Sequence, residues 1–182
     1  MKKKIYLVLS QNYTILSRII KIVTKDKYSH ISISFDKQCT DMYAIGRTFT
    51  RWPFSGNYKN ESIYEGVYTL NKKSQIVVYE LSVSNNQYKN IKQLLNKYGN
   101  ESKGYNFLGL IFALFNKKLN RKKYYCSEFI YKILSDDNVK LFSKTKDVVK
   151  PMDFVKMKNL NKIYEGNIIK YKDMNIYEKI MI

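Results

Sequence analysis

The stretch YYCSEFIYKIL, residues 124–134, predicts a helix that begins near Cys126. Apolar residues follow Cys126 at intervals of three, four, seven and eight positions: Phe129, Ile130, Ile133 and Leu134. Residues at these intervals share one helix face, so Cys126 is expected on the buried face of the first turn. Unpaired backbone N–H groups and the positive end of the helix dipole lie there, and both stabilise a thiolate. A buried structural cysteine is the alternative interpretation, and this stretch alone does not decide between the two.

A second stretch, HISISF at residues 30–35, alternates between polar and apolar residues. Alternation is the period of a half-buried strand, with Ile31 and Ile33 on one face and His30 on the other. His30 is the single histidine of the chain. A lone histidine usually has no catalytic role, but an imidazole beside Cys126 would complete an activated thiol nucleophile. His30 is therefore a candidate base because Cys126 is a candidate nucleophile.

The remaining periodicity predicts a single α+β domain over residues 1–182, in which a small, mainly antiparallel sheet packs against helices. Further strands are expected at residues 5–9, 42–45 and 75–83, with one or two more around 164–171. Helices are expected over residues 14–25, after the capping pair Ser84 and Gln87, over 107–119, and briefly after Pro151. Residues 46–66 are expected to form a long loop, in which Trp52 could line a substrate groove or cover the core.

Two of the expected helices are strongly apolar. Residues 14–25 carry apolar side chains at helical spacing, which is typical of an amphipathic helix: Ile15, Leu16, Ile19, Ile20 and Val23. Residues 107–119 are apolar nearly all round, which indicates either deep burial or contact with a membrane.

The charge of the chain restricts its partners. It contains 33 Lys and Arg against 15 Asp and Glu, a formal net charge of +18. This charge attracts anionic partners, but the basic residues form no dense stripe, so most of them are expected on solvated surface. Aromatic residues make up 15% and could stack on bases, so a non-catalytic basic module that binds nucleic acid is one alternative. That alternative leaves Cys126 unexplained, and nucleic acid is not an expected partner.

The two cysteines, Cys39 and Cys126, are too few for a disulfide framework. The N-terminal MKKKIYLVLSQN has too short an apolar part for a secretory signal, and residues 107–115 are too short for a membrane span. We therefore expect a soluble cytoplasmic protein with reduced thiols. The spacing of the histidine and cysteines fits no common zinc site, and no glycine-rich phosphate loop occurs, so neither a metal nor a cofactor is expected.

The motifs YSHISISFD and YYCSEFIYKIL, in this order, resemble the permuted branch of the NlpC-type papain-fold amidases, the YiiX-like proteins. The resemblance covers most of the chain, from the first strand to residues 163–166, and the aromatic-Cys-Ser-Glu-apolar pattern is its most specific part. It implies a circularly permuted papain-like fold. It also implies that Cys126 attacks an amide carbonyl, that His30 takes the thiol proton, and that water releases an acyl-enzyme. A backbone N–H at the helix start, that of Cys126 itself, would help to hold the oxyanion.

The chain departs from the family pattern at one position. The family usually has a third polar residue, often glutamate, on the strand after the histidine strand, and residues 42–45 place Tyr43 there. The Tyr43 hydroxyl could orient the imidazole more weakly than a carboxylate, or Tyr43 could simply pack.

The substrate class stays open between a peptide, an N-acyl compound and a lipid. Related folds also act on thioesters and lipid acyl groups, so a lipid-directed thiol acyl hydrolase or acyltransferase at a membrane surface is the alternative enzyme. Its support is the apolar segment at residues 106–112 beside Lys117 and Lys118, which would suit weak contact with an anionic membrane.

Overall fold

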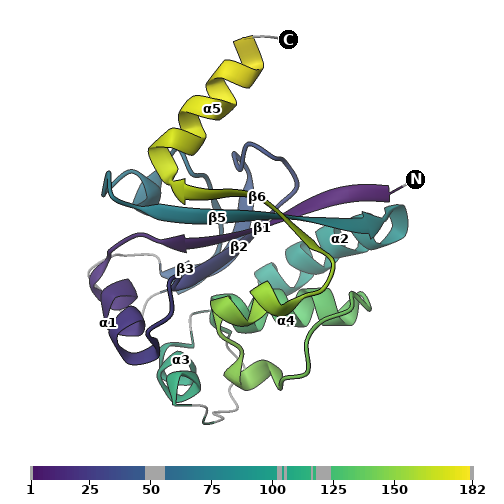
Figure 1. Cartoon of the computed structure of the whole chain (residues 1–182). Coiled ribbons are helices and arrows are strands. Elements are labelled where there is room, and N and C mark those ends of the chain that lie inside the picture. Colours follow the sequence, from purple (N-terminus) through teal and green to yellow (C-terminus); the bar gives the residue numbers. More distant parts are fainter. Residues whose placement is uncertain are drawn as a thin grey trace.

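The computed structural model describes residues 2–47, 56–101, 104, 106–115, 117 and 124–180. They form one six-stranded sheet with helices packed around it (Figure 1). The strand order is β4-β3-β2-β1-β5-β6, and every neighbouring pair is antiparallel. The expected α+β class and antiparallel sheet are confirmed.

The expected strands form, and one unexpected strand joins them. The strands are β1 (Lys2–Gln11), β2 (His30–Ser34), β3 (Met42–Arg47), β4 (Gly56–Glu61), β5 (Gln75–Ser84) and β6 (Leu160–Asn167). The expected loop at residues 46–66 is wrong in part, because β4 lies inside it and pairs with β3 from Met42–Glu61 to Arg47–Gly56. The β4 sequence GNYKNE has no alternating apolar residues, so no strand period marks it. Trp52 lies outside the described residues.

The helices are α1 (Ile15–Thr24), α2 (Asn85–Glu101), α3 (Phe107–Leu114), α4 (Cys126–Asp136) and α5 (Ile168–Ile180), with short 3₁₀ turns η1 (Gly66–Tyr68), η2 (Lys146–Val148) and η3 (Pro151–Lys156). Two helical elements begin where capping residues predicted, α2 and η3. Before α2, the backbone N–H of Ser84 donates to Gln87 Oε1 at 3.0 Å and that of Gln87 donates to Ser84 Oγ at 3.1 Å. This is the reciprocal pairing of a capping box. Pro151 opens η3 as expected.

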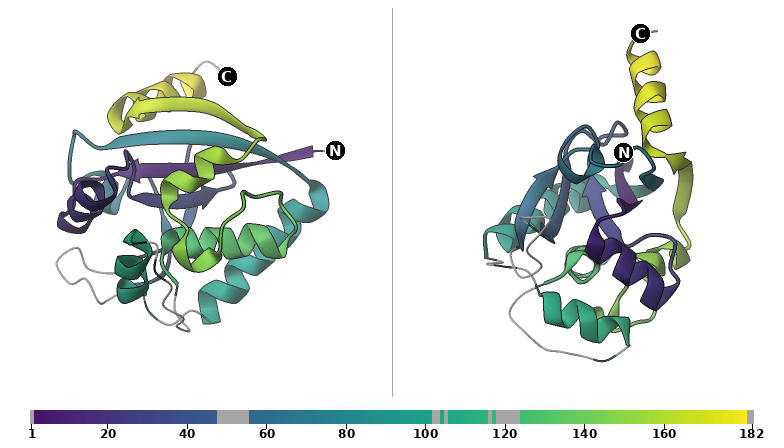
Figure 2. Two further views of the ribbon diagram at one scale, coloured as in Figure 1. Left: turned by 60° about the horizontal axis from the view of Figure 1, so that its bottom comes forward. Right: turned by 90° about the vertical axis from the view of Figure 1, so that its left-hand side faces the viewer.

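The C-terminal element differs from the expectation. Strand β6 ends at Asn167, and α5 follows where a strand was expected up to residue 171. Three of its residues are buried at intervals of three and four positions, which is a helical period: Ile168, Tyr171 and Asn175. Beyond its first turns α5 projects away from the rest of the fold (Figure 2).

The sheet is covered on both faces. Ile5, Leu7 and Leu9 of β1 point into the larger apolar cluster, which α2 and α4 complete. Tyr6 and Val8 point into a second cluster on the opposite face. Burying one large apolar side chain contributes about 1.5–3 kcal/mol, so two such layers hold the sheet in place. As a consequence β2 is not half-buried: its polar face, expected to be open, is covered too.

Within the described sheet, the first residue of β2, His30, is paired on one side only. The strand pairs with β1 along its whole length, from Tyr6–Ser34 to Ser10–His30. Its ladder with β3 pairs Ile33 with Tyr43 and Ser34 with Met42, and does not reach the described backbone opposite His30. His30 therefore pairs with Ser10 of β1 but has no paired residue among the described residues of β3.

Candidate thiol active site

Cys126 is the first residue of α4. The preceding Tyr125 has extended backbone angles, with φ −106° and ψ 170°, so the helix begins at the cysteine as the periodicity predicted. Cys126 is only 2% exposed and belongs to the larger apolar cluster together with Phe129 and Ile130. A helix begins with backbone N–H groups that have no partner within the helix, and Cys126 lies in that first turn.

Two side chains that follow Cys126 anchor the start of α4. Ser127 Oγ donates a hydrogen bond of 2.7 Å to the carbonyl of Val149. Glu128 is 3% exposed and lies near the side chain of Asn106, whose Oδ1 caps α3 by accepting from the backbone N–H of Gly109. These contacts fix the helix start, and with it the position of the thiol.

His30 lies close enough to Cys126 for the two side chains to interact electrostatically. The other contacts of the imidazole are made by Nε2, which lies 3.0 Å from Glu61 Oε2 and 3.2 Å from Ser32 Oγ. Nδ1 is therefore the ring nitrogen left for the thiol. The fold brings together the two residues that the sequence singled out.

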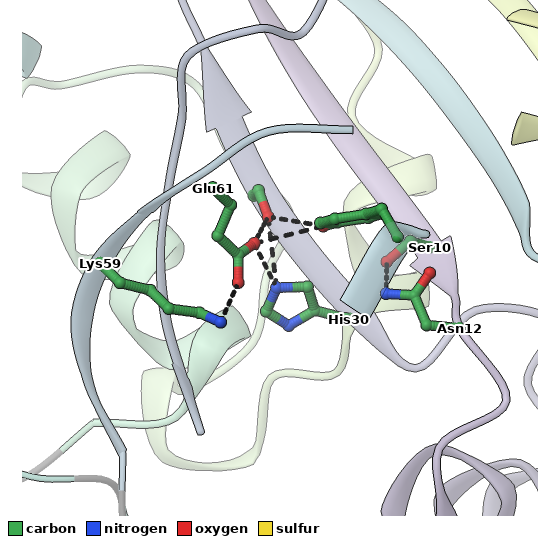
Figure 3. A network of polar contacts seen from close by, with 7 residues as sticks. Ser10, Asn12, His30, Lys59 and Glu61 are labelled. Atoms are coloured by element: carbon green, nitrogen blue, oxygen red, sulfur yellow. Dashed lines mark hydrogen bonds and ion pairs between the residues drawn. The ribbon is translucent and has the colours of Figure 1, made fainter. Parts of the chain in front are cut away.

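Glu61, the last residue of β4, holds the imidazole from the other side (Figure 3). Its side chain is 4% exposed. Its Oε2 also accepts hydrogen bonds from Ser32 Oγ at 2.8 Å and from the Tyr68 hydroxyl at 3.2 Å. Its Oε1 pairs with Lys59 Nζ at 3.1 Å. A buried carboxylate with this many donors is held in one orientation.

The same contacts determine which ring nitrogen carries a proton. The Ser32 hydroxyl has one proton and donates it to Glu61. A carboxylate only accepts, so Nε2 of His30 supplies the proton of its own contact with Glu61. This fixes the tautomer and leaves Nδ1 to take the thiol proton.

The charges of the three groups support one another. Burial by itself lowers the pKa of His30, but the charges of Glu61 and Cys126 outweigh it and raise this pKa to about 10. Burial raises the pKa of Glu61, but His30 and Lys59 lower it well below its usual range. At neutral pH the imidazole is therefore held as an imidazolium between the Glu61 carboxylate and the Cys126 sulfur, and its Nδ1 proton is the one that the thiol gives up.

Tyr43 is not the residue that orients the imidazole. Its hydroxyl donates a hydrogen bond of 2.7 Å to Asp41, and its ring stacks on Tyr58 at 6.1 Å between centroids. Glu61 orients the imidazole instead. It lies on β4, whereas the orienting residue was expected on β3. The sequence assigned Glu61 to a loop, because β4 lacks a strand period.

The second cysteine has a different environment. Cys39 lies in a turn with φ 57°, is completely buried, and donates from Sγ to the carbonyl of Lys37 at 3.5 Å. Burial and the charge of Asp36 raise the pKa of its thiol. Cys39 belongs to the second apolar cluster and not to the site.

Among the described residues, no three His, Cys, Asp or Glu side chains gather closely enough to hold a metal ion. No helix in that part of the chain is both long and apolar enough to cross a membrane.

No protein-family model matches the sequence, and no curated protein matches it either. The functional conclusion therefore depends on the arrangement of Cys126, His30 and Glu61.

Proposed function

We propose that the protein is a thiol hydrolase that cleaves an amide bond, in a peptide or an N-acyl compound, through Cys126. The observation that carries this proposal is the connected series Glu61–His30–Cys126, with the sulfur at the first residue of a helix. A nucleophile, a base and a group that orients the base are the three parts of an activated thiol. A structural cysteine needs neither the imidazole nor the carboxylate.

In the first half of the reaction, the Cys126 sulfur attacks the carbonyl carbon of the substrate. The carbonyl electron pair moves to oxygen, and the backbone N–H groups at the start of α4 stabilise the resulting oxyanion. Collapse of this intermediate breaks the C–N bond, and His30 Nδ1 donates its proton to the departing amine. An acyl-thioester on Cys126 remains.

In the second half, His30 acts in the opposite direction. Its neutral Nδ1 takes a proton from water, and the hydroxide oxygen attacks the thioester carbonyl. The C–S bond breaks, the acid product leaves, and the thiol site is restored. Throughout, Glu61 keeps the Nε2 proton in place and stabilises the imidazolium, as a third group does in other hydrolytic triads.

The same arrangement supports a circularly permuted papain-like fold as the finer description of the α+β class. The histidine strand β2 precedes the cysteine helix α4 in the chain, and α4 packs against β2 and β3. The carboxylate comes from β4 of the same antiparallel sheet, with β3 between it and β2. The order of the histidine strand and the cysteine helix is the one that the resemblance implies, whereas the carboxylate lies one strand further on.

The exposure of the pair indicates how a substrate reaches it. Cys126 is 2% exposed, whereas the side chain of His30 is 19% exposed. A carbonyl therefore approaches the sulfur along the open edge of the imidazole. This direction also brings the leaving nitrogen close to the proton donor.

A covalent acyl probe tests the proposal. The protein is incubated with a peptidyl or N-acyl vinyl sulfone, and the modified residue is located by intact-mass and peptide mass spectrometry. Cys126→Ser should abolish the modification, and Cys39→Ser, the matched control, should leave it unchanged. Equal labelling of both thiols, or labelling that persists in Cys126→Ser, would overturn the proposed nucleophile.

A further inference from the structure

A second feature of the fold is an apolar surface formed by two neighbouring helices. We call it the α1–α3 surface, and its exposed members are Ile15 at 72%, Ile19 at 49%, Ile22 at 76%, Val23 at 42%, Leu108 at 38%, Phe112 at 38% and Phe115 at 62%. The two helices touch and lie side by side on the flank of the molecule, as the right-hand view of Figure 2 shows. Large apolar side chains gathered in this way mark an interaction site.

The surface arises because α1 turns only part of its apolar side chains inward. The helix buries Ile20 and Ser17, while the side chains at Ile15, Ile19 and Ile22 point to solvent. An amphipathic helix of a globular protein normally does the opposite and turns its apolar stripe to the core. The apolar pattern predicted for α1 is present, but among its described side chains only Ile20 joins the core, and the other apolar side chains face solvent.

Cations border this apolar stripe. With 3.6 residues per turn, Arg18, Lys21 and Lys25 occupy the arc of α1 next to the stripe, and all three are exposed. Lys117, just beyond α3, is exposed as well. Residues 12–25, 106–115 and 117 contain no aspartate or glutamate, so the two segments present positive charge only.

We propose that the α1–α3 surface docks on an anionic lipid bilayer, with both helices parallel to the membrane plane. Helices that lie in an interface combine an apolar face of Leu, Ile and Phe with a polar face rich in Lys and Arg, and α1 has this arrangement. The long side chains of Arg18 and Lys21 can bury their methylene groups and keep their charges among lipid headgroups. The net charge of +18 adds long-range attraction to the same surface.

The surface flanks the thiol site but does not depend on it. Strand β1 leads into α1, and its residue Ser10 pairs with His30. The backbone N–H of Asn106, at the start of α3, donates to the Tyr124 carbonyl at 3.0 Å, directly before α4. Docking would thus bring the Cys126–His30 end of the fold towards the bilayer, whether or not Cys126 is catalytic.

Vesicle co-sedimentation tests the apolar part of the proposal. The full chain should bind vesicles of phosphatidylcholine with 30 mol% phosphatidylglycerol, chosen as an anionic probe, and bind pure phosphatidylcholine much less. Ile15→Asp combined with Ile22→Asp should weaken binding to anionic vesicles roughly tenfold or more, because both side chains would enter the interface. Leu70→Asp is the matched control, since Leu70 is 66% exposed on another part of the fold.

A second pair of variants tests the local charge. Lys21→Glu should weaken binding to the anionic vesicles, whereas Lys89→Glu, an exposed lysine on α2, changes the net charge equally and should have little effect. Binding should also fall as salt rises from low to physiological concentration. If both variants lose vesicle binding equally, binding depends only on the total charge of the protein, and the proposal of a specific docking surface is overturned.

Three further outcomes decide the proposal. No binding to anionic vesicles, or equal loss in Leu70→Asp, overturns it. A dimer in light scattering that Ile15→Asp with Ile22→Asp dissociates, without vesicle binding, assigns the surface to a second copy of the chain instead. Cys126→Ser should bind vesicles like the unaltered protein, and the α1 variant should keep its acyl-probe labelling, so failure of docking and failure of the catalytic proposal remain distinguishable.

Discussion

Cys126 and Cys39 are both buried, at 2% and 0% exposure, yet their surroundings differ in almost every other respect. Cys126 starts a helix and contacts His30, whose other nitrogen is held by Glu61. Cys39 lies in a tight turn, where its sulfur faces the carbonyl of Lys37. Burial alone therefore does not distinguish a reactive thiol from an inert one. The difference lies in which charge can be stabilised next to the sulfur.

The electrostatic surroundings of the two thiols act in opposite directions. Near Cys39, burial and the Asp36 charge both disfavour a thiolate. Near Cys126, the protonated imidazole of His30 and the positive end of the α4 dipole lie instead. The following predictions test this contrast, beginning with the largest expected effect.

The two thiols should differ strongly in alkylation rate. With iodoacetamide at pH 7, Cys126 should react roughly 100-fold faster than Cys39, because the thiolate is the reacting form. His30→Asn should remove most of this difference by slowing Cys126 alone. Peptide mass spectrometry with timed quenching measures both rates in one sample.

Circular dichroism of His30→Asn serves as the folding control for this comparison. If the folded variant keeps the full rate difference, the imidazole does not activate Cys126.

The charge on His30 should depend on Glu61 and not on Tyr43. Because the chain has a single histidine, its imidazole can be followed without assignment in an NMR pH titration. The pKa of His30 should lie near 10 in the unaltered protein. Glu61→Gln removes the negative charge that offsets burial, so this pKa should fall by several units. Tyr43→Phe, which loses only the bond to Asp41, should leave it unchanged.

The same titration defines a stability window. The pKa of His30 is about 10 in the folded state, above the ordinary value of 6.5. Its protonation therefore stabilises the fold fully below pH 6.5, and this contribution is lost as pH rises through about 10. In the NMR titration, a larger change of the His30 pKa in Tyr43→Phe than in Glu61→Gln would contradict the role of Glu61.

The smallest effect concerns a second buried acid. Burial and the charge of Asp147 raise the pKa of Glu128 to about 7, from the ordinary 4.5, in contrast to Glu61 with its two cations. The stabilising contribution of neutral Glu128 is complete below pH 4.5 and is lost as pH rises through about 7. Glu128→Gln cannot ionise, so its Tm should match the unaltered protein near pH 5 and exceed it by roughly 2–4 °C at pH 8.

Differential scanning fluorimetry across this pH range measures the effect. The exposed Glu65→Gln is the control and should show no such divergence. A constant Tm difference at all pH values would mean that Glu128 is already ionised in the fold.

Local periodicity was sufficient for most elements of this fold. The apolar intervals after Cys126 predicted α4, and the Ser84–Gln87 pair predicted the start of α2, because both signals lie within a few residues of what they determine. A similar spacing occurs in α5 at Ile168, Tyr171 and Asn175, but Asn175 is polar, so the apolar pattern there is too short to predict a helix. Strand β4 carried no comparable signal, since its side chains are mostly polar.

By itself, the sequence determined that a cysteine starts an apolar helix and that the single histidine occupies the polar face of a strand. Only the tertiary structure decided that these two residues meet, and that Glu61 and Tyr68 complete the polar network around His30. Only the tertiary structure showed, in addition, that most of the apolar stripe of α1 faces solvent. The physical reason is range: helical and strand periods follow from neighbours along the chain, whereas a contact between β2, β4 and α4 depends on how the whole sheet and its helices pack.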